Sequence, residues 1–165
     1  MAANPKKQLS LDTNVLLDLA KSLDFAHEFR EEFQRRGYSL LVAPTALMEL
    51  EYFITFGNEL EQNLAKKASD QIETWDLSAF DLPDVKLNIA ENFARRLQHQ
   101  NIIPYEEFND GLILAETSLA EIPLLVTSDK HLLNIDEDAL LLAFNDADLS
   151  PVHPSHPRRL LKALR

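Results

Sequence analysis

Four acidic residues from distant parts of this 165-residue chain could form one catalytic or metal-binding site. Asp12 and Asp129 each come directly after a short apolar stretch that is typical of a buried strand, and Asp110 opens an apolar helical run. Glu49 lies about one turn into a helix that follows another strand, roughly 6 Å of rise from the end of that strand. Because ligands in open α/β folds bind at the carboxyl ends of the strands, we expect all four side chains at one edge of a sheet.

Carboxylates that meet at one edge repel one another. At an effective dielectric constant near 20, two unit charges that are 4 Å apart cost about 4 kcal/mol. A hard cation, Mg²⁺ or Mn²⁺, removes this cost, and it prefers a donor set made only of oxygens. Two such ions could hold the attacking water and the departing oxygen of a phosphodiester, so the pattern predicts hydrolysis by a metal-activated water.

Each acid also has an ordinary structural explanation. An aspartate between a strand and a helix is a common helix cap, so Asp12 or Asp110 taken singly is more often structural than catalytic. Four acids expected at the same edge favour a metal site. Glu49 and Glu51 lie about 100° to either side of Leu50 on the expected helix, so helical periodicity does not choose between them.

Strands and helices alternate along the chain, which favours a three-layer α/β/α sandwich with a central parallel sheet. We find no repeat or linker, so a single domain over residues 1–165 is expected. The expected strands are 8–11, 40–43, 124–127 and 149–153, with 77–82 as either an edge strand or a loop. The expected helices are 15–22, 25–36, 46–55 after a Thr45 cap, 59–75, 87–100, 111–121 after an Asn109-Asp110 cap, 138–144 and 158–165.

Composition limits the possible chemistry. Without cysteine there is no disulfide framework, thiolate zinc site or cysteine nucleophile, and the three glycines lie too far apart for a dinucleotide or P-loop motif. The N-terminus lacks an apolar leader and no apolar run is long enough to span a membrane, so we expect a cytoplasmic protein.

The formal charge of −11 at first argues against a nucleic-acid partner, because Lys and Arg supply most of the affinity for phosphate. Bound divalent cations would change this balance, since they would present positive charge to a phosphate and offset the acids. Four basic residues between positions 158 and 165 could also contact RNA, but a solvated helix face is the favoured interpretation.

Four segments of the chain resemble the PIN domains, which are metal-dependent ribonucleases that include the VapC-type toxins of bacterial toxin–antitoxin pairs. The resemblance extends over roughly residues 8–161, and its motifs occur in the order typical of the family, each on its expected element. The segments are LSLDTNVLLD at 9–18, PTALMEL at 44–50, NDGLILAE at 109–116 and TSD at 127–129.

The resemblance implies that Asp12, Glu49, Asp110 and Asp129 are the catalytic residues and the ligands of Mg²⁺ or Mn²⁺, and it selects Glu49 over Glu51. It further implies endonucleolytic cleavage of single-stranded RNA that leaves a 3′-hydroxyl and a 5′-phosphate. The resemblance is also the source of the expectation that this chain is the toxin of a toxin–antitoxin pair.

Further expectations concern the surroundings of the acids and the partners. Small family members form homodimers and are silenced by an antitoxin whose peptide enters the acidic groove, so we expect a homodimer and a cognate antitoxin. An aromatic group beyond Glu49 could serve such an interface, although core packing is favoured for its apolar members: Tyr52, Phe53 and Phe56. Three flanking polar residues either orient the carboxylates or make ordinary cap and strand-end bonds: Asn14, Thr127 and Ser128.

Three other functions are weighed against the toxin. An RNA-processing nuclease fits a chain longer than the compact toxins, with extra length between residues 58 and 101. A non-catalytic RNA- or protein-binding module has no reason to keep four repelling acids. An aspartate-nucleophile phosphatase also places an aspartate after its first strand, but it needs a second acid two residues on, where this chain has Asn14.

Overall fold

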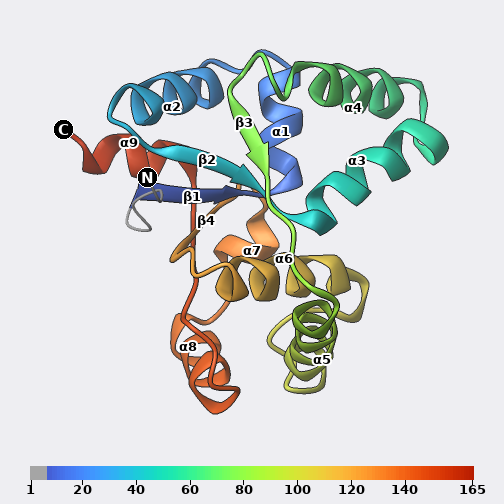
Figure 1. Cartoon of the computed structure of the whole chain (residues 1–165), viewed down its shortest axis with the longest axis vertical. Coiled ribbons are helices and arrows are strands. Elements are labelled where there is room, and N and C mark those ends of the chain that lie inside the picture. Colours follow the sequence, from blue (N-terminus) through green and yellow to red (C-terminus); the bar gives the residue numbers. More distant parts are fainter. Residues whose placement is uncertain (1–6) are drawn as a thin grey trace.

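The protein is built around a parallel β-sheet, seen here in a computed structural model that describes residues 7–165. Within these residues the sheet has five strands in the order β3-β2-β1-β4-β5, and every neighbouring pair is parallel (Figure 1). The strands are β1 (Gln8–Leu11), β2 (Ser39–Val42), β3 (Leu77–Ala79), β4 (Leu124–Val126) and β5 (His153–Ser155).

Helices cover both faces of the sheet, so the predicted three-layer α/β/α sandwich is confirmed. Figure 1 shows α1, α2 and α4 over one face and α5, α6 and α8 over the other. Among residues 7–165, no helix is both long enough and apolar enough to cross a membrane. The helices are α1 (Thr13–Ala20), α2 (Asp24–Arg35), α3 (Pro44–Phe56), α4 (Glu59–Gln71), α5 (Asp84–His99), the 3-10 helix η2 (Tyr105–Glu107), α6 (Phe108–Leu119), α7 (Lys130–Leu133), α8 (Glu137–Asp146) and α9 (Pro157–Ala163).

The central strand β1 is buried on both of its faces. Leu9 and Leu11 are almost fully buried, and Ser10, which points to the opposite face, is buried as well. The Ser10 hydroxyl has a partner there, because the Thr117 hydroxyl of α6 lies 2.9 Å from it. Burial on both faces explains why the strands of this sheet are apolar runs without strict alternation.

The last strand differs from its expected position. Residues 149–153 were expected to form it, but β5 begins at His153 and includes Pro154. A proline lacks an N–H and is tolerated in an edge strand, where one side of the backbone has no neighbour to bond. Of the other uncertain segment, 77–82, the first three residues form the opposite edge strand β3 and the rest is loop.

Helix α3 begins earlier than expected, and Thr45 is not its cap. Pro44 occupies the first turn, where its fixed φ suits a helix and its missing N–H costs nothing, and Ala43 is the N-cap residue. Thr45 instead bonds to Glu116 of α6: its N–H donates to Glu116 Oε1 at 3.0 Å and its hydroxyl donates to Oε2 at 2.5 Å. This buried carboxylate therefore replaces a local cap and joins α3 to α6.

We predict that Glu116→Ala lowers the free energy of unfolding by about 2–3 kcal/mol, because two buried donors at the start of α3 lose their acceptor. Urea denaturation followed by circular dichroism measures the change. Glu51→Ala, at an exposed position of α3, is the matched control and should change stability by less than about 0.5 kcal/mol. Equal stabilities for the two variants would contradict the bridging role of Glu116.

Candidate metal centre

Asp12 is held rigidly between β1 and α1. Its Oδ1 accepts a hydrogen bond of 2.8 Å from the Thr13 N–H, so that it caps α1, and its Oδ2 accepts one of 2.7 Å from the Thr127 hydroxyl. The Asp12 N–H donates to the Val126 carbonyl at 2.9 Å, which ties the end of β1 to the end of β4. Asp12 is only 2% exposed, so its side chain has little freedom to turn towards solvent.

Asp129 follows β4 and caps the short helix α7. Its Oδ1 accepts a bond of 2.9 Å from the His131 N–H, and its own N–H donates to the Thr127 hydroxyl oxygen at 3.0 Å. Thr127 therefore lies between two of the acids: it donates to Asp12 and accepts from Asp129.

Asp110 lies in the first turn of α6. The sequence had predicted that it would cap this helix, and that prediction is wrong. The helix already begins at Phe108, directly after η2, so Asp110 is its third residue. Gly111 lets this turn pack closely on its neighbours, because a Cβ there would lie 2.8 Å from Ile103 Cδ1 and 3.0 Å from Ala94 Cβ of α5. This close packing helps to set where the Asp110 carboxylate lies.

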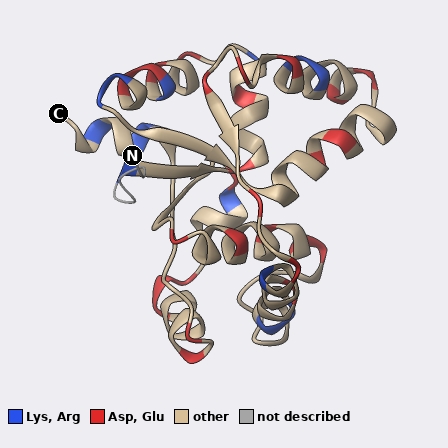
Figure 2. Ribbon diagram, in the orientation of Figure 1, with Lys and Arg blue, Asp and Glu red and all other residues tan. Residues whose placement is uncertain are grey.

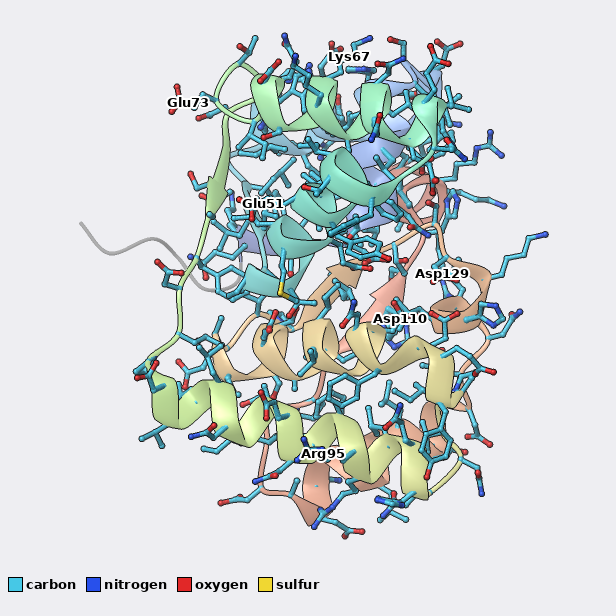
Figure 3. The ribbon with its side chains drawn as sticks, turned by 90° about the vertical axis from the view of Figure 1, so that its right-hand side faces the viewer. Glu51, Lys67, Glu73, Arg95, Asp110 and Asp129 are labelled. Atoms are coloured by element: carbon cyan, nitrogen blue, oxygen red, sulfur yellow. The ribbon has the colours of Figure 1, made fainter. Side chains whose placement is uncertain are left out.

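The three aspartates form one compact cluster. Asp12, Asp110 and Asp129 each place a carboxylate oxygen within 4.8 Å of the other two. Figure 3 shows Asp110 on α6 close to Asp129. Asp110 Oδ2 is buried and has no hydrogen-bond partner among residues 7–165. A buried acceptor without a donor, in a site made only of carboxylates, fits a hard divalent cation such as Mg²⁺ or Mn²⁺.

The electrostatics of the cluster also favour a cation. Burial raises the pKa of Asp12 to about 7, aided by the charges of Glu49 and Asp129, although hydrogen bonds from Thr127 and Thr13 oppose the rise. Burial likewise raises the pKa of Asp110 to about 9, with further contributions from neighbouring acids. A positive charge at this point would restore ionisation near neutral pH.

Glu49 lies at the rim of the cluster and outside its three-oxygen group. Its Oε1 accepts a bond of 2.7 Å from the Thr13 hydroxyl. Burial raises the pKa of Glu49, while hydrogen bonds from Thr13 and Asn109 lower it, and its charge acts on Asp12. Glu51 is exposed on the same helix (Figure 3), so of the two glutamates it is Glu49 that lies beside the cluster.

Two of the flanking polar residues do not contact the acids as expected. The Ser128 hydroxyl donates to Asp18 Oδ2 of α1 at 2.6 Å and not to a motif carboxylate. Asn14 makes no side-chain hydrogen bond to the four acids within residues 7–165, whereas the side chain of its neighbour Thr13 bonds to Glu49 at the rim. A rotation of 100° per residue explains this, because only one of two adjacent helical positions can face Glu49.

Four residues of this site were not found from the sequence: Thr13, Asp18, Glu107 and Asn109. Thr13 carried a usable signal, because it directly follows a strand-end aspartate. Glu107 raises the pKa of Asp110, but its place in η2 is not evident from periodicity. Asp18 and Asn109 act on partners from other elements, which no local pattern reveals.

The fold and the site define an α/β protein with an acidic centre at the carboxyl ends of its strands. The family model for the PIN domain matches residues 9–138, so the chain belongs to the PIN domain family, a family of nucleases that use divalent metals. No curated protein sequence matches the chain at a significant level.

Two solved structures share the fold. VapBC2 from Rickettsia felis, bound to a DNA fragment from its promoter, has a TM-score of 0.61 and 17% identity, covering 90% of this chain and 98% of the other. VapBC-1 from nontypeable Haemophilus influenzae has a TM-score of 0.58 and 15% identity, covering 92% of this chain and 98% of the other.

We predict that Asp110→Asn stabilises the metal-free protein. The folded-state pKa of Asp110 is raised from 3.8 to about 9, so folding disfavours its ionised form, which prevails in the unfolded chain above pH 4. The stabilising effect of the variant should therefore grow as the pH rises from 5 to 9, reaching at least about 2 kcal/mol. Urea denaturation in EDTA at pH 5, 7 and 9 measures this difference.

Manganese should make the wild type more stable than Asp110→Asn, the reverse of their order in EDTA. At pH 7.5 it should raise the unfolding temperature of the wild type by several degrees and leave Asp110→Asn almost unchanged, because binding to the folded state stabilises it. If Asp110→Asn is less stable than the wild type in EDTA at every pH, the proposed cost of ionising buried Asp110 is contradicted.

Proposed function

We propose that this protein is a metal-dependent endoribonuclease that hydrolyses phosphodiester bonds of single-stranded RNA with a metal-activated water. The observation that carries the proposal is the cluster of Asp12, Asp110 and Asp129, each of which places one carboxylate oxygen within 4.8 Å of the other two. Asp110 Oδ2 is buried there and has no hydrogen-bond partner among residues 7–165. Membership of a family of nucleases supports the same reaction class.

The residues of the centre divide their roles. Asp12, Asp110 and Asp129 would hold Mg²⁺ or Mn²⁺, and Glu49 would complete the acidic quartet from the rim. When bound, the cation supplies a Lewis acid that lowers the pKa of a water and offsets charge at the phosphate. Thr127 keeps Asp12 oriented by its 2.7 Å bond, and Thr13 does the same for Glu49.

The basic residues of α9 make contacts within the protein, so we propose that the substrate is recruited through the metal and not through this helix. The basic residues of α9 lie near the C-terminus, beside α2 (Figures 1 and 2). Arg158 packs there with its guanidinium 4.7 Å from the centre of the Phe25 ring, and Arg165 pairs with Glu28 at 3.6 Å. These contacts support the interpretation of α9 as a structural helix with a solvated face.

We further propose that the protein is the toxin of a toxin–antitoxin pair, with a cognate antitoxin as its partner. The support comes from the two structural neighbours, both of which are VapBC proteins of nearly the same extent as this chain. The homodimer inferred from the family resemblance belongs to the same proposal.

The first experiment measures cleavage of a fluorescently labelled single-stranded RNA in Mn²⁺. The wild type should cut it to products with 3′-hydroxyl and 5′-phosphate ends, and EDTA should abolish the reaction. Asp12→Asn and Asp110→Asn should each reduce kcat/KM at least 100-fold, since each removes a ligand charge from the centre. Cleavage that survives EDTA would contradict the proposal.

Glu49→Gln and Glu51→Gln form a matched pair in the same assay. Both remove one negative charge from α3, but only Glu49 contacts Thr13 and acts on Asp12. We expect a loss of at least tenfold in kcat/KM for Glu49→Gln and less than twofold for Glu51→Gln. Equal losses would show that the rim position of Glu49 has no role.

The toxin role has its own prediction. Induced expression of the wild type in a bacterial host should arrest growth, and expression of Asp110→Asn at an equal level should not. Colony counts after induction, with protein levels checked by immunoblot, measure the effect. Normal growth alongside confirmed ribonuclease activity in vitro would favour an RNA-processing nuclease instead of a toxin.

A further inference from the structure

A pocket opens beside the metal centre, between α3 and the start of α6. Its volume is about 290 Å³, and its surface is mostly apolar. It is lined by Met48, Glu49, Tyr52, Phe53 and Asn109.

Two of the side chains that line this pocket, Met48 and Tyr52, are largely exposed. Tyr52 is 60% exposed and Met48 54% exposed, whereas Phe53 is half-buried and packs against the core, as was favoured for it. The Tyr52 ring packs against the rings of Phe53 and Phe56, with centroid distances of 6.2 and 5.2 Å. Aromatic contacts therefore support the ring from within α3 and leave much of it open to solvent, as a binding surface requires.

The pocket is continuous with the metal centre. Glu49 forms part of its wall and also bonds to Thr13, the residue after Asp12. Asn109 forms another part of the wall and directly precedes Asp110. A group that occupies the pocket therefore lies next to a group bound at the metal centre. A base and the phosphate of the same nucleotide are neighbours in the same way.

We propose that this pocket binds an unpaired nucleobase of the RNA strand, adjacent to the scissile phosphate. The base stacks on the Tyr52 ring and contacts Met48 and Phe53, and the amide of Asn109 offers both a donor and an acceptor to its edge. This inference rests on the proposed ribonuclease function and adds to it the group through which the strand is positioned.

The charge distribution favours a base over a phosphate in the pocket. The chain carries a net charge of −11, and Glu49 lies in the pocket wall, so a phosphate there would be repelled. Stacking needs no positive charge and accepts any base through its π-face. One stacked base strengthens binding by about 5- to 150-fold, which would compensate in part for the lack of basic contacts.

Tyr52→Trp provides a direct probe of stacking. The natural Trp75 is 6% exposed and gives a constant background, whereas a tryptophan at position 52 should be quenched by a stacked base. The ligand is a single-stranded phosphorothioate RNA in Mn²⁺, compared with RNAs in which one nucleotide at a time is abasic. Phe56→Trp is the matched control, because Phe56 is 71% exposed on the same helix but does not line the pocket.

We expect quenching for Tyr52→Trp and none for Phe56→Trp. One abasic position should remove the quenching and weaken binding by at least fivefold. In cleavage assays Tyr52→Ala should raise KM at least fivefold with kcat and Mn²⁺ affinity unchanged, and Tyr52→Phe should restore KM, because it keeps the ring.

The possible failures are distinguishable. If the wild type cuts RNA but Tyr52→Ala leaves KM unchanged and every abasic RNA binds equally well, the base pocket is overturned and the nuclease stands. If Tyr52→Ala weakens only the complex with a cognate antitoxin, the pocket serves a protein partner and the proposal is likewise overturned. Absence of any metal-dependent cleavage by the wild type would overturn the proposed function itself.

Discussion

The cost of burying carboxylates close to one another is the constraint on which the rest of this structure depends. Asp12, Asp110 and Asp129 bring oxygens within 4.8 Å of one another, and the first two are almost fully buried. Burial contributes more than neighbouring charge to their raised pKa values. A site of this kind costs folding free energy whenever it is ionised without a counter-ion, so its presence is most simply explained by the binding of a cation.

The scaffold offsets this cost with specific hydrogen bonds between elements. Thr127 links Asp12 to the backbone of Asp129, so the ends of β1 and β4 are fixed relative to each other. Glu116 bonds to Thr45 and so joins α6, which carries Asp110, to α3, which carries Glu49. The acids therefore lie on a rigid frame, and a frame of this kind keeps ligands preorganised for an ion.

The same arrangement is compatible with the proposed polyanionic substrate despite the acidity of the protein. The centre itself attracts phosphate only when a cation is bound, and the surrounding acids oppose any non-specific binding of nucleic acid. The exposed aromatic pocket beside Glu49 offers a second kind of contact, which does not depend on charge. In the proposed function, the metal would contact the phosphate and the aromatic ring would contact a base.

The sequence by itself determined the fold class and the order of the elements. Apolar runs ending in Asp12 and Asp129, with helices between them, were sufficient to predict a parallel α/β/α sandwich and to expect acids at one edge. These are local signals, because an apolar strand or a helical periodicity can be recognised within a segment of about ten residues. The family resemblance added the choice of Glu49, which periodicity had left open.

Only the tertiary structure decided which side chains contact one another. Ser128 turns to Asp18 and not to a motif acid, Thr45 bonds to Glu116 and not to its own helix, and Tyr52 is exposed beside the centre. Each outcome depends on a partner from a distant part of the chain, and side-chain orientation is set by the packing of whole elements. The sequence therefore specified where acids would gather, and the packing specified what surrounds them.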